Sequence, residues 1–251
     1  MPGKALVSRV RARVRGRERL REYRDTTRER LRAEQYARWR KSPVKPRTVM
    51  YESFSGNGML CNPEAIFRAL LAAPDMQDLE HVWALDEVEK HAEVVAEFEG
   101  DPRVRFVDMR TPGYLKALAT SKYLFNNATF PPEFAKRPGQ VYVNTWHGVP
   151  LKHMGYDVPG GGPASRNILR NLVSADYLLS ANQFMTDRMY RHAFRLQGLY
   201  QGTVIEEGQP RTDRQVAAEA DPSAVRSRLE AAGVQVGGRR VIVYAPTWRG
   251  S

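Results

Sequence analysis

One histidine in the chain has the setting that acid–base chemistry requires. Residues 141–144 predict a short strand, and residues 145–152 follow it with the sequence TWHGVPLK. Open α/β sheets place ligands at the carboxyl ends of their strands, so His147 is expected beside a bound substrate. An imidazole with an ordinary pKa near ~6.5 can accept a proton from an attacking hydroxyl, and Lys152 could neutralise a phosphate. The alternative is a hydrogen-bonded structural histidine in a turn that its glycine and proline neighbours fix.

A second candidate site follows the first predicted strand, residues 48–54. Gly56, Asn57 and Gly58 form a turn there, and a helix is expected to open after Asn62. Such a turn lets a phosphate approach the backbone N–H groups of a helix N-terminus. The spacing is not that of the dinucleotide-binding fingerprint, and Gly-Asn-Gly also makes an ordinary tight turn, so both interpretations stay open.

Two later segments each carry an arginine beyond a predicted strand. Residues 206–213 include Arg211, which could hold a phosphate or pair with Asp213 or a neighbouring glutamate. Residues 244–249, with the sequence YAPTWR, continue from a strand predicted at residues 241–244. Each segment is a weak signal by itself. The other histidines lack a strand-end setting and are expected at the surface: His81, His91, His153 and His192.

In this order, the segments resemble those of the CDP-glycerol glycerophosphotransferase family of teichoic acid polymerases and primases, whose members carry TWHGTPLK, then GxPRND, then YAPTWR. The matching residues here are 145–152, 208–213 and 244–249, with Val149 and Thr212 as departures. The resemblance implies transfer of glycerol phosphate, or a related polyol phosphate, from CDP-glycerol or a similar CDP-alcohol to a polyanionic lipid-linked acceptor, with release of CMP. It makes His147 the catalytic base. The residues that it implies for substrate binding are Gly56, Asn57, Gly58, Trp146, Gly148, Lys152, Arg211, Asp213, Thr247 and Arg249.

Family members resemble two Rossmann-type domains that face each other across a cleft, the arrangement called GT-B, with the acceptor on the first domain and the cytidine nucleotide on the second. The resemblance predicts a Rossmann-like acceptor domain at 48–207 and a linker with the start of a donor domain at 208–251. The charge and helical pattern of the first residues predict a basic helical arm at 1–47. Family members also carry RxHP and TDYSS segments after YAPTWR, and the sequence contains neither. We therefore expect the second Rossmann-like domain to be incomplete, and these residues alone to have little transferase activity.

The alternation of short β-branched runs with amphipathic stretches predicts an α/β fold with a doubly wound parallel sheet. Strands are predicted at 48–54, 81–86, 104–109, 123–127, 141–146, 177–181, 203–207 and 241–244. Helices are predicted at 63–73, 87–98, 113–120, 165–174, 182–194 and 222–232. A linker is expected between Gly208 and Asp221, because prolines stand near both ends of that stretch.

The positive charge of the chain is concentrated in its first 47 residues, which hold 17 Lys or Arg against 5 Asp or Glu. The rest of the chain has a net charge of −1, so an anionic partner is expected at the arm alone. Residues 8–41 predict one helix with a thin apolar stripe, which should bury little and lie on a surface. An anionic membrane surface is one partner for this arm, and a merely solvated helix is the alternative. Nucleic acid is not expected as a partner, because proteins that bind it usually extend their basic surface over the folded domain.

Several expected absences limit the remaining possibilities. The single cysteine, Cys61, suits a reducing compartment, and no signal-peptide core or run of about 20 apolar residues occurs. These features favour a cytoplasmic protein. The basic arm and the lipid-linked acceptor that the resemblance implies place it on the inner face of the plasma membrane. No carboxylate cluster demands a metal, and no cofactor is expected. Two alternatives remain: a non-catalytic binding module whose arm holds a membrane or nucleic acid, and a sugar-nucleotide glycosyltransferase of GT-B type.

Overall fold

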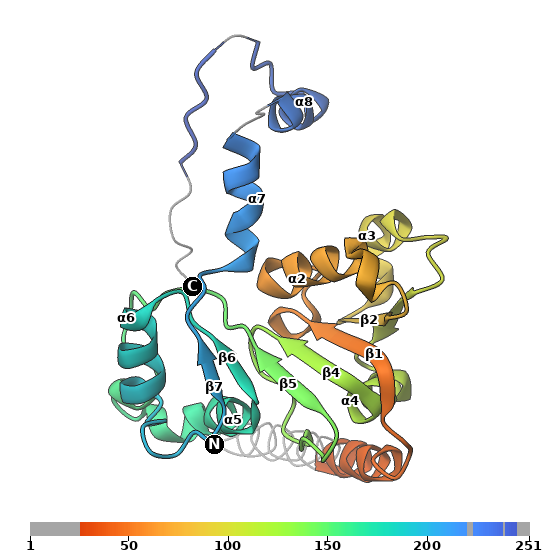
Figure 1. The fold of residues 1–251 in the computed structure, drawn as a ribbon, viewed down its shortest axis with the longest axis vertical. Helices are drawn as coiled ribbons and strands as arrows, with labels where there is room; N and C mark the ends of the chain where they lie inside the picture. The colour runs from red at the N-terminus through yellow and green to blue at the C-terminus, as the bar shows by residue number, and fades with distance from the viewer. Residues whose placement is uncertain (1–25, 220–222, 238, 245–251) are drawn as a thin grey trace, which may run out of the picture. The chain divides into compact units, whose positions relative to one another are not determined.

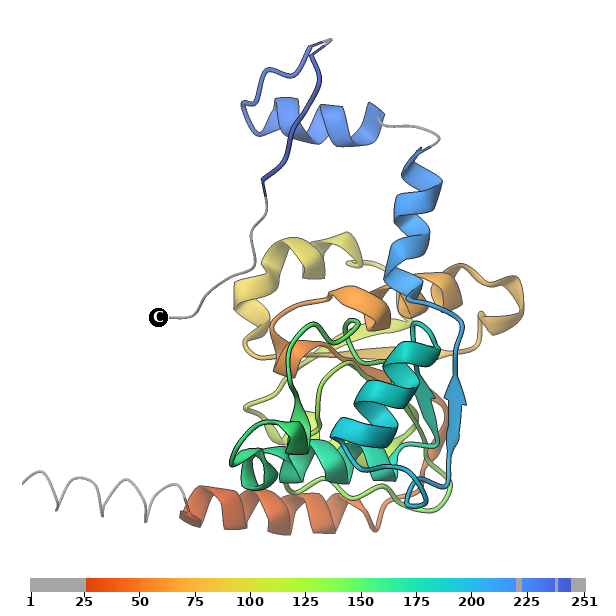
Figure 2. The same ribbon diagram turned by 90° about the vertical axis from the view of Figure 1, so that its left-hand side faces the viewer.

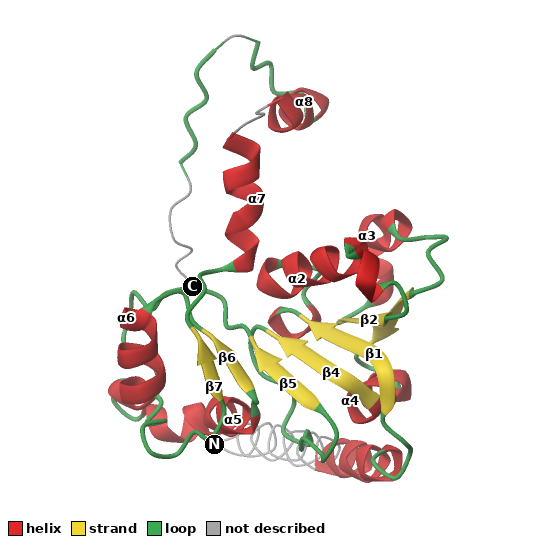
Figure 3. Ribbon diagram, in the orientation of Figure 1, coloured by secondary structure: helices red, strands yellow, loops and turns green. Residues whose placement is uncertain are grey.

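A computed structural model of the chain describes residues 26–219, 223–237 and 239–244. Within residues 1–210, seven parallel strands form one sheet in the order β3-β2-β1-β4-β5-β6-β7 (Figures 1 and 3). The first strand, β1, lies inside the sheet, and β2 and β3 are added in turn on one side of it. The next strand, β4, pairs with the other side of β1, and β5, β6 and β7 follow outward from it, as in a doubly wound sheet. The predicted α/β class and the first seven predicted strands are confirmed. The strands are β1 (Lys45–Glu52), β2 (Glu80–Leu85), β3 (Val104–Asp108), β4 (Ser121–Asn126), β5 (Val141–Asn144), β6 (Tyr177–Leu179) and β7 (Thr203–Ile205).

Helices follow most of the strands, close to the predicted ranges. The longer ones are α2 (Cys61–Ala72), α3 (Ala92–Glu97), α4 (Pro112–Thr120), α5 (Gly161–Ser174), α7 (Pro210–Glu219) and α8 (Ser223–Ala231). The helix predicted at 182–194 is a short α6 (Gln183–Met185) that continues as a π-helix over Thr186–Ala193. Short 3₁₀ turns occupy Phe54–Gly56, Pro74–Met76, Val88–His91 and Gly155–Asp157.

Both faces of the sheet are buried, as a parallel sheet requires. Side chains alternate between the two faces along each strand. Met50 of β1 therefore joins one core with Leu115 of α4, while the next residue, Tyr51, joins a second core with Phe67 of α2. All four side chains are at most 1% exposed. These two cores fix the register of the sheet, and with it the positions of the loops at its carboxyl edge.

The N-terminal helix, described here over residues 26–39, packs against the body along one edge (red in Figures 1 and 2). Tyr36 is only 2% exposed, and its hydroxyl donates a hydrogen bond to the Ala135 carbonyl at 3.2 Å. Trp39 packs against the same core. The prediction that this helix buries little is therefore wrong for its second half, because its aromatic residues are inserted into a core that the sequence pattern did not reveal. Its predicted beginning at residues 8–25 lies outside the described residues.

Two further predictions about the later part of the chain are wrong. Residues 241–244 form no strand, and their side chains are 45–87% exposed. A strand needs a hydrogen-bonding neighbour, and the described residues of the 211–251 unit form no other strand. The stretch expected to be a linker contains α7, with Pro210 as its first residue. Proline suits the first position of a helix because the N–H that it lacks would have no partner within the helix. Within the described ranges, no helix is both long and apolar enough to cross a membrane.

Candidate functional site at the carboxyl edge of the sheet

Three buried polar residues end neighbouring strands at the same level of the sheet. Glu52 of β1 pairs in register with Asn126 of β4, which pairs with Asn144 of β5. The Asn126 amide donates to a Glu52 carboxylate oxygen at 3.1 Å. Asn144 donates to the Ala128 carbonyl at 2.9 Å and accepts from the backbone N–H of Trp146 at 3.1 Å. This polar row fixes the course of the chain immediately after β4 and β5.

Glu52 is the one carboxylate in this row and is fully buried. Its second carboxylate oxygen accepts a hydrogen bond from the Tyr114 hydroxyl at 2.7 Å. Burial raises the pKa of Glu52 to about 7, although the hydrogen bonds from Tyr114 and Asn126 favour the ionised form. Neither the role of Glu52 nor the register of the row could be predicted from the sequence, because both depend on which strands are neighbours in the sheet.

His147 lies three residues beyond β5 and is oriented by a backbone carbonyl. Its Nδ1 is 2.6 Å from the carbonyl oxygen of Asn127. A carbonyl oxygen can only accept, so Nδ1 must carry the proton and Nε2 is the basic nitrogen of the neutral ring. The imidazole is stacked on the indole of Trp146 with ring centroids 4.6 Å apart, and the edge of Phe54 approaches it at 5.4 Å. This is the tautomer and the restraint that a general base needs.

Asn127, which orients the histidine, also connects two strand ends. Its side-chain oxygen accepts a hydrogen bond from the backbone N–H of Phe54 at 2.8 Å. Its amide nitrogen is buried and has no acceptor among the residues that the structure describes. A buried donor without an acceptor costs about 1–3 kcal/mol, and such groups often mark places where a ligand or water oxygen binds.

The backbone around the histidine is strained. Trp146, Phe54 and Ser55 have φ angles of 48°, 47° and 56°, in the left-handed region that residues other than glycine rarely adopt. Such conformations cost about 1–3 kcal/mol each, cluster at functional sites, and persist only where surrounding contacts enforce them. For Trp146 those contacts include the hydrogen bond to Asn144, so the strain is a consequence of the polar row below it.

Asn62, in the first turn of α2, connects the site to a third strand end. Its amide nitrogen lies 3.2 Å from the Thr145 carbonyl, 3.3 Å from the Trp146 carbonyl and 2.6 Å from the side-chain oxygen of Gln209. The sequence identified Asn62 only as a helix start. Its structural role is to join the beginning of α2 to the connections that follow β5 and β7.

The glycine turn after β1 is explained in part by packing. Gly56 has φ +84°, and a β-carbon there would lie 2.5 Å from the backbone nitrogen of Asp86 and 2.4 Å from the sulfur of Met109. The Asp86 N–H also donates to the Gly56 carbonyl at 2.9 Å. Gly58 has φ +129°, and Asn57 between the two glycines is exposed. Gly56 is thus required for the approach of β1 to the end of β2, and phosphate binding by this turn stays a prediction.

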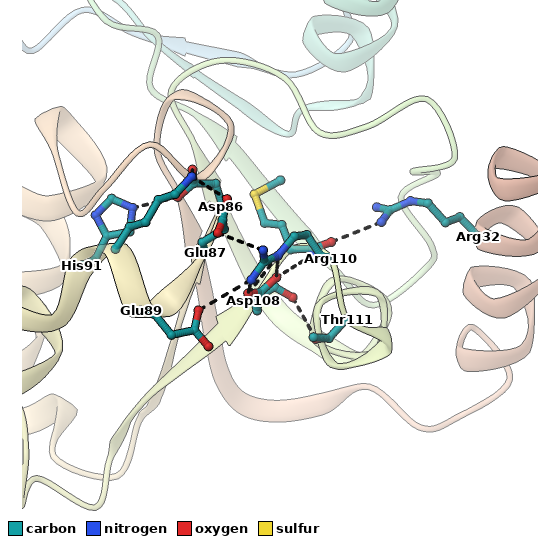
Figure 4. Close-up of polar contacts among 10 residues, drawn as sticks. Arg32, Asp86, Glu87, Glu89, His91, Asp108, Arg110 and Thr111 are labelled. Carbon is teal, nitrogen blue, oxygen red and sulfur yellow. Dashed lines mark hydrogen bonds and ion pairs between the residues drawn. The ribbon is translucent and has the colours of Figure 1, made fainter. Parts of the chain in front are cut away.

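An ion-pair network covers the same edge beyond β2 and β3 (Figure 4). Arg110 contacts Asp108 at 2.5 Å, Glu87 at 2.9 Å and Glu89 at 3.6 Å. In Figure 4 its guanidinium lies among these carboxylates. Because three acidic groups already compensate it, Arg110 is poorly suited to bind a phosphate. The network makes this part of the edge acidic.

The family model of CDP-glycerol:poly(glycerophosphate) glycerophosphotransferases matches residues 34–251. The chain belongs to this family. It is 31% identical over 216 residues to a teichoic acid poly(glycerol phosphate) polymerase of Bacillus spizizenii, covering 82% of this chain and 51% of the relative. A polymerase of the same description from Bacillus subtilis is also 31% identical, with 82% of this chain and 27% of the relative covered. The chain thus spans between about a quarter and a half of the length of these relatives.

Solved structures of the family share the fold. The wall teichoic acid polymerase TagF superposes with a TM-score of 0.70 at 25% identity, covering 93% of this chain and 56% of that one. A variant of TagF soaked with CDPG superposes with a TM-score of 0.72 at 26% identity, with the same coverage. The seven-stranded sheet described above is therefore a fold that this family is known to adopt.

In this glycerophosphotransferase-family chain, the structure brings only some of the predicted site residues together. Trp146, His147 and Gly148 lie side by side after β5, and Lys152 lies farther along the same exposed connection. Arg211 and Asp213 are exposed on α7, and those two residues belong to the separate 211–251 unit. Thr247 and Arg249 fall outside the described residues.

The prediction that His81 lies at the surface is wrong. It is fully buried in β2, where its Nδ1 is 3.0 Å from the Tyr51 hydroxyl, and burial lowers its pKa to about 4. The alternation of side chains along β2 places His81 on the face of the sheet that α2 covers. The sequence does not show which face of its strand is buried, so the burial of this histidine could not be predicted. In the part of the chain that the structure describes, no three His, Cys, Asp or Glu side chains are grouped so as to hold a metal ion.

Proposed function

We propose that this chain forms the acceptor side of an enzyme that transfers glycerol phosphate from CDP-glycerol to the end of a glycerol phosphate chain. The observation that carries the proposal is the orientation of His147, whose Nδ1 donates to the Asn127 carbonyl at 2.6 Å and whose Nε2 is therefore the basic nitrogen. Membership of the family and the position at a strand end support the same assignment.

In the proposed reaction a terminal hydroxyl of the acceptor attacks the β-phosphorus of CDP-glycerol. The new oxygen–phosphorus bond forms as the bond to the CMP oxygen breaks, and the hydroxyl proton passes to Nε2 of His147. Positioning and charge stabilisation supply most of the catalysis of such phosphoryl transfers. The buried row below the site and the strained turn at Trp146 serve positioning, because they hold the imidazole in one orientation.

The proposed reaction is tested with a form of the protein that includes a donor domain, because these 251 residues alone are expected to have little transferase activity. That form is incubated with a glycerol phosphate oligomer and one nucleotide donor at a time. We expect CMP to be released from CDP-glycerol, with lengthening of the oligomer, and no nucleotide to be released from a UDP-sugar. Chromatography of the nucleotides and mass spectrometry of the oligomer measure the two products. Release of UDP from the sugar nucleotide without release of CMP would contradict the proposal and favour a glycosyltransferase.

We further propose that the basic N-terminal segment holds the protein to an anionic membrane surface, where a lipid-linked acceptor would lie. A basic residue close to such a surface contributes about 1 kcal/mol, and the first 47 residues carry 17 of them. We expect sedimentation with phosphatidylglycerol vesicles that weakens as salt increases and that is reduced by deletion of residues 1–25. Equal binding to phosphatidylcholine vesicles would refute an electrostatic attachment.

A further inference from the structure

A groove opens between the 150–157 connection, which continues from the segment that carries His147, and the helical segment 183–193. Its volume is about 480 Å³. Ring contacts connect the histidine to the residue that follows the groove-lining Ala193: the indole of Trp146 stacks on His147 and also meets the ring of Phe194 at 5.7 Å. The lining begins at Pro150, three residues beyond His147 in the sequence, so a chain that leaves the groove along this connection runs toward the proposed base.

The groove carries positive charge that the protein does not neutralise. Lys152 and Arg188 both line it and are exposed, and neither has a carboxylate within 4.0 Å among the described residues. The lining contains one carboxylate, Asp157, in the described chain. That group already contacts His192 at 3.0 Å and Arg195 at 3.7 Å. Two uncompensated cations in one concave surface attract an anion.

The two walls of the groove are held in fixed contact. Gly155 has φ +56°, and a β-carbon there would lie 2.5 Å from the carbonyl oxygen of Ala193 at the end of the π-helix. The π-helix itself is a rare element that occurs frequently at functional sites. It carries Arg188 and His192, four residues apart, on the side that lines the groove. A preformed site loses less free energy to ordering when its ligand binds.

The opposite part of the same sheet edge has the opposite charge. Beyond β2 and β3, the carboxylates of Asp86, Glu87, Glu89 and Asp108 outnumber the cations of Lys90 and Arg110, which pair with them (Figure 4). A polyanion whose end lies at His147 is therefore repelled from one side of the edge and attracted to the other.

We propose that the groove binds a phosphodiester of the acceptor chain, with Lys152 and Arg188 as its ligands, while the terminal hydroxyl of that chain lies at His147. The exposed side chains of Leu151 and Phe184, which also line the groove, then contact the glycerol carbons. A chain fits better than a lipid bilayer because the two cations line a concave groove, whereas a bilayer presents a broad surface. The inference rests on the proposed function and assigns the acceptor subsite of that same site.

Calorimetric titration of the 251-residue chain tests this assignment without requiring turnover. The probes are a synthetic glycerol phosphate oligomer, an uncharged polyglycerol of equal length, and phosphatidylglycerol vesicles. We expect binding of the oligomer and not of polyglycerol, with affinity lowered at least about tenfold by Lys152→Ala and by Arg188→Ala, as for hydrogen bonds to charged groups. The matched control is Arg191→Ala, on the same helix but paired with Asp187 at 2.7 Å and outside the groove, which should change affinity less than about twofold.

Several other outcomes of the titration overturn the assignment, provided that thermal unfolding shows the variants to be folded. Absence of oligomer binding, or unchanged binding in both groove variants, excludes the subsite. An equal loss in Arg191→Ala indicates diffuse attraction by the whole surface. Binding of vesicles alone, lost in the groove variants, assigns the groove to a lipid headgroup. Oligomer binding that depends on the groove, together with UDP release in the donor assay, would leave the subsite standing and refute the proposed reaction.

Discussion

In an active form of the protein that includes a donor domain, replacing His147 by asparagine is expected to slow the release of CMP by about 10²–10⁴-fold, the usual contribution of a general base. The asparagine amide nitrogen stands close to the place of Nδ1, so it can still donate to the Asn127 carbonyl and keep the loop in position. The substitution removes Nε2, the proposed acceptor of the proton. The affinity for the glycerol phosphate oligomer should therefore change little, and the loss should fall on the maximal rate.

The control for this substitution is His91→Asn, which alters a histidine at the same sheet edge that bonds to Asp86 at 2.8 Å and takes no part in the proposed reaction. Initial rates at saturating oligomer, with the oligomer affinity measured separately, distinguish the two variants. A His147→Asn enzyme whose rate stays within about twofold of the parent would show that the histidine is structural, which was the alternative interpretation of its sequence.

The second large effect concerns the pH dependence of stability and comes from Glu52. Its pKa is about 7 in the folded protein, against an ordinary value of 4.5. Between these values the folded chain keeps a proton that the unfolded chain releases, so stability falls as pH rises from about 4.5 to 7 and is constant above. The full loss is about 3 kcal/mol, since one pKa unit corresponds to about 1.4 kcal/mol. The Glu52→Gln variant has no ionisable group at this position, so it should not show this loss of stability.

Urea unfolding of the parent and of Glu52→Gln, at a series of pH values across this range, measures the difference directly. The stability of the variant relative to the parent should grow by about 3 kcal/mol between pH 4.5 and 7.5. Tyr114→Phe supplies an internal check, because it removes a hydrogen bond to the ionised carboxylate and should move the midpoint of the change to higher pH. Parallel curves for parent and Glu52→Gln would mean that Glu52 does not titrate in this way.

The sequence was sufficient to predict the seven strands of the sheet and the position of the histidine after one of them, because local residue patterns indicate both. A short apolar run followed by TWHG identifies a strand end without knowledge of its neighbours. Asn62, Asn126 and Asn144 could not be assigned their roles in this way. Each also has a partner at least 16 residues away in sequence, and only the strand order and register bring these partners together.

The predictions that were wrong have the same origin. Tyr36 looked like a residue of a solvated helix because the surface that covers it comes from the β4–β5 connection, nearly 100 residues away. Residues 241–244 have the composition of a strand, but composition supplies no hydrogen-bonding neighbour. Pro210 looked like a chain breaker and begins a helix, since the effect of a proline depends on its position within an element.

The exposed connection that carries Leu151 and Lys152 has an evolutionary consequence. Leu151 is 94% exposed, whereas the strand that precedes it ends in the fully buried Asn144. Substitutions in the connection therefore cost little folding free energy, while those in the buried row cost much. Leu151 and Lys152 nevertheless match the segment TWHGTPLK that family members carry. Because folding does not require these exposed side chains, we expect selection to keep them for function and to keep the buried row for stability.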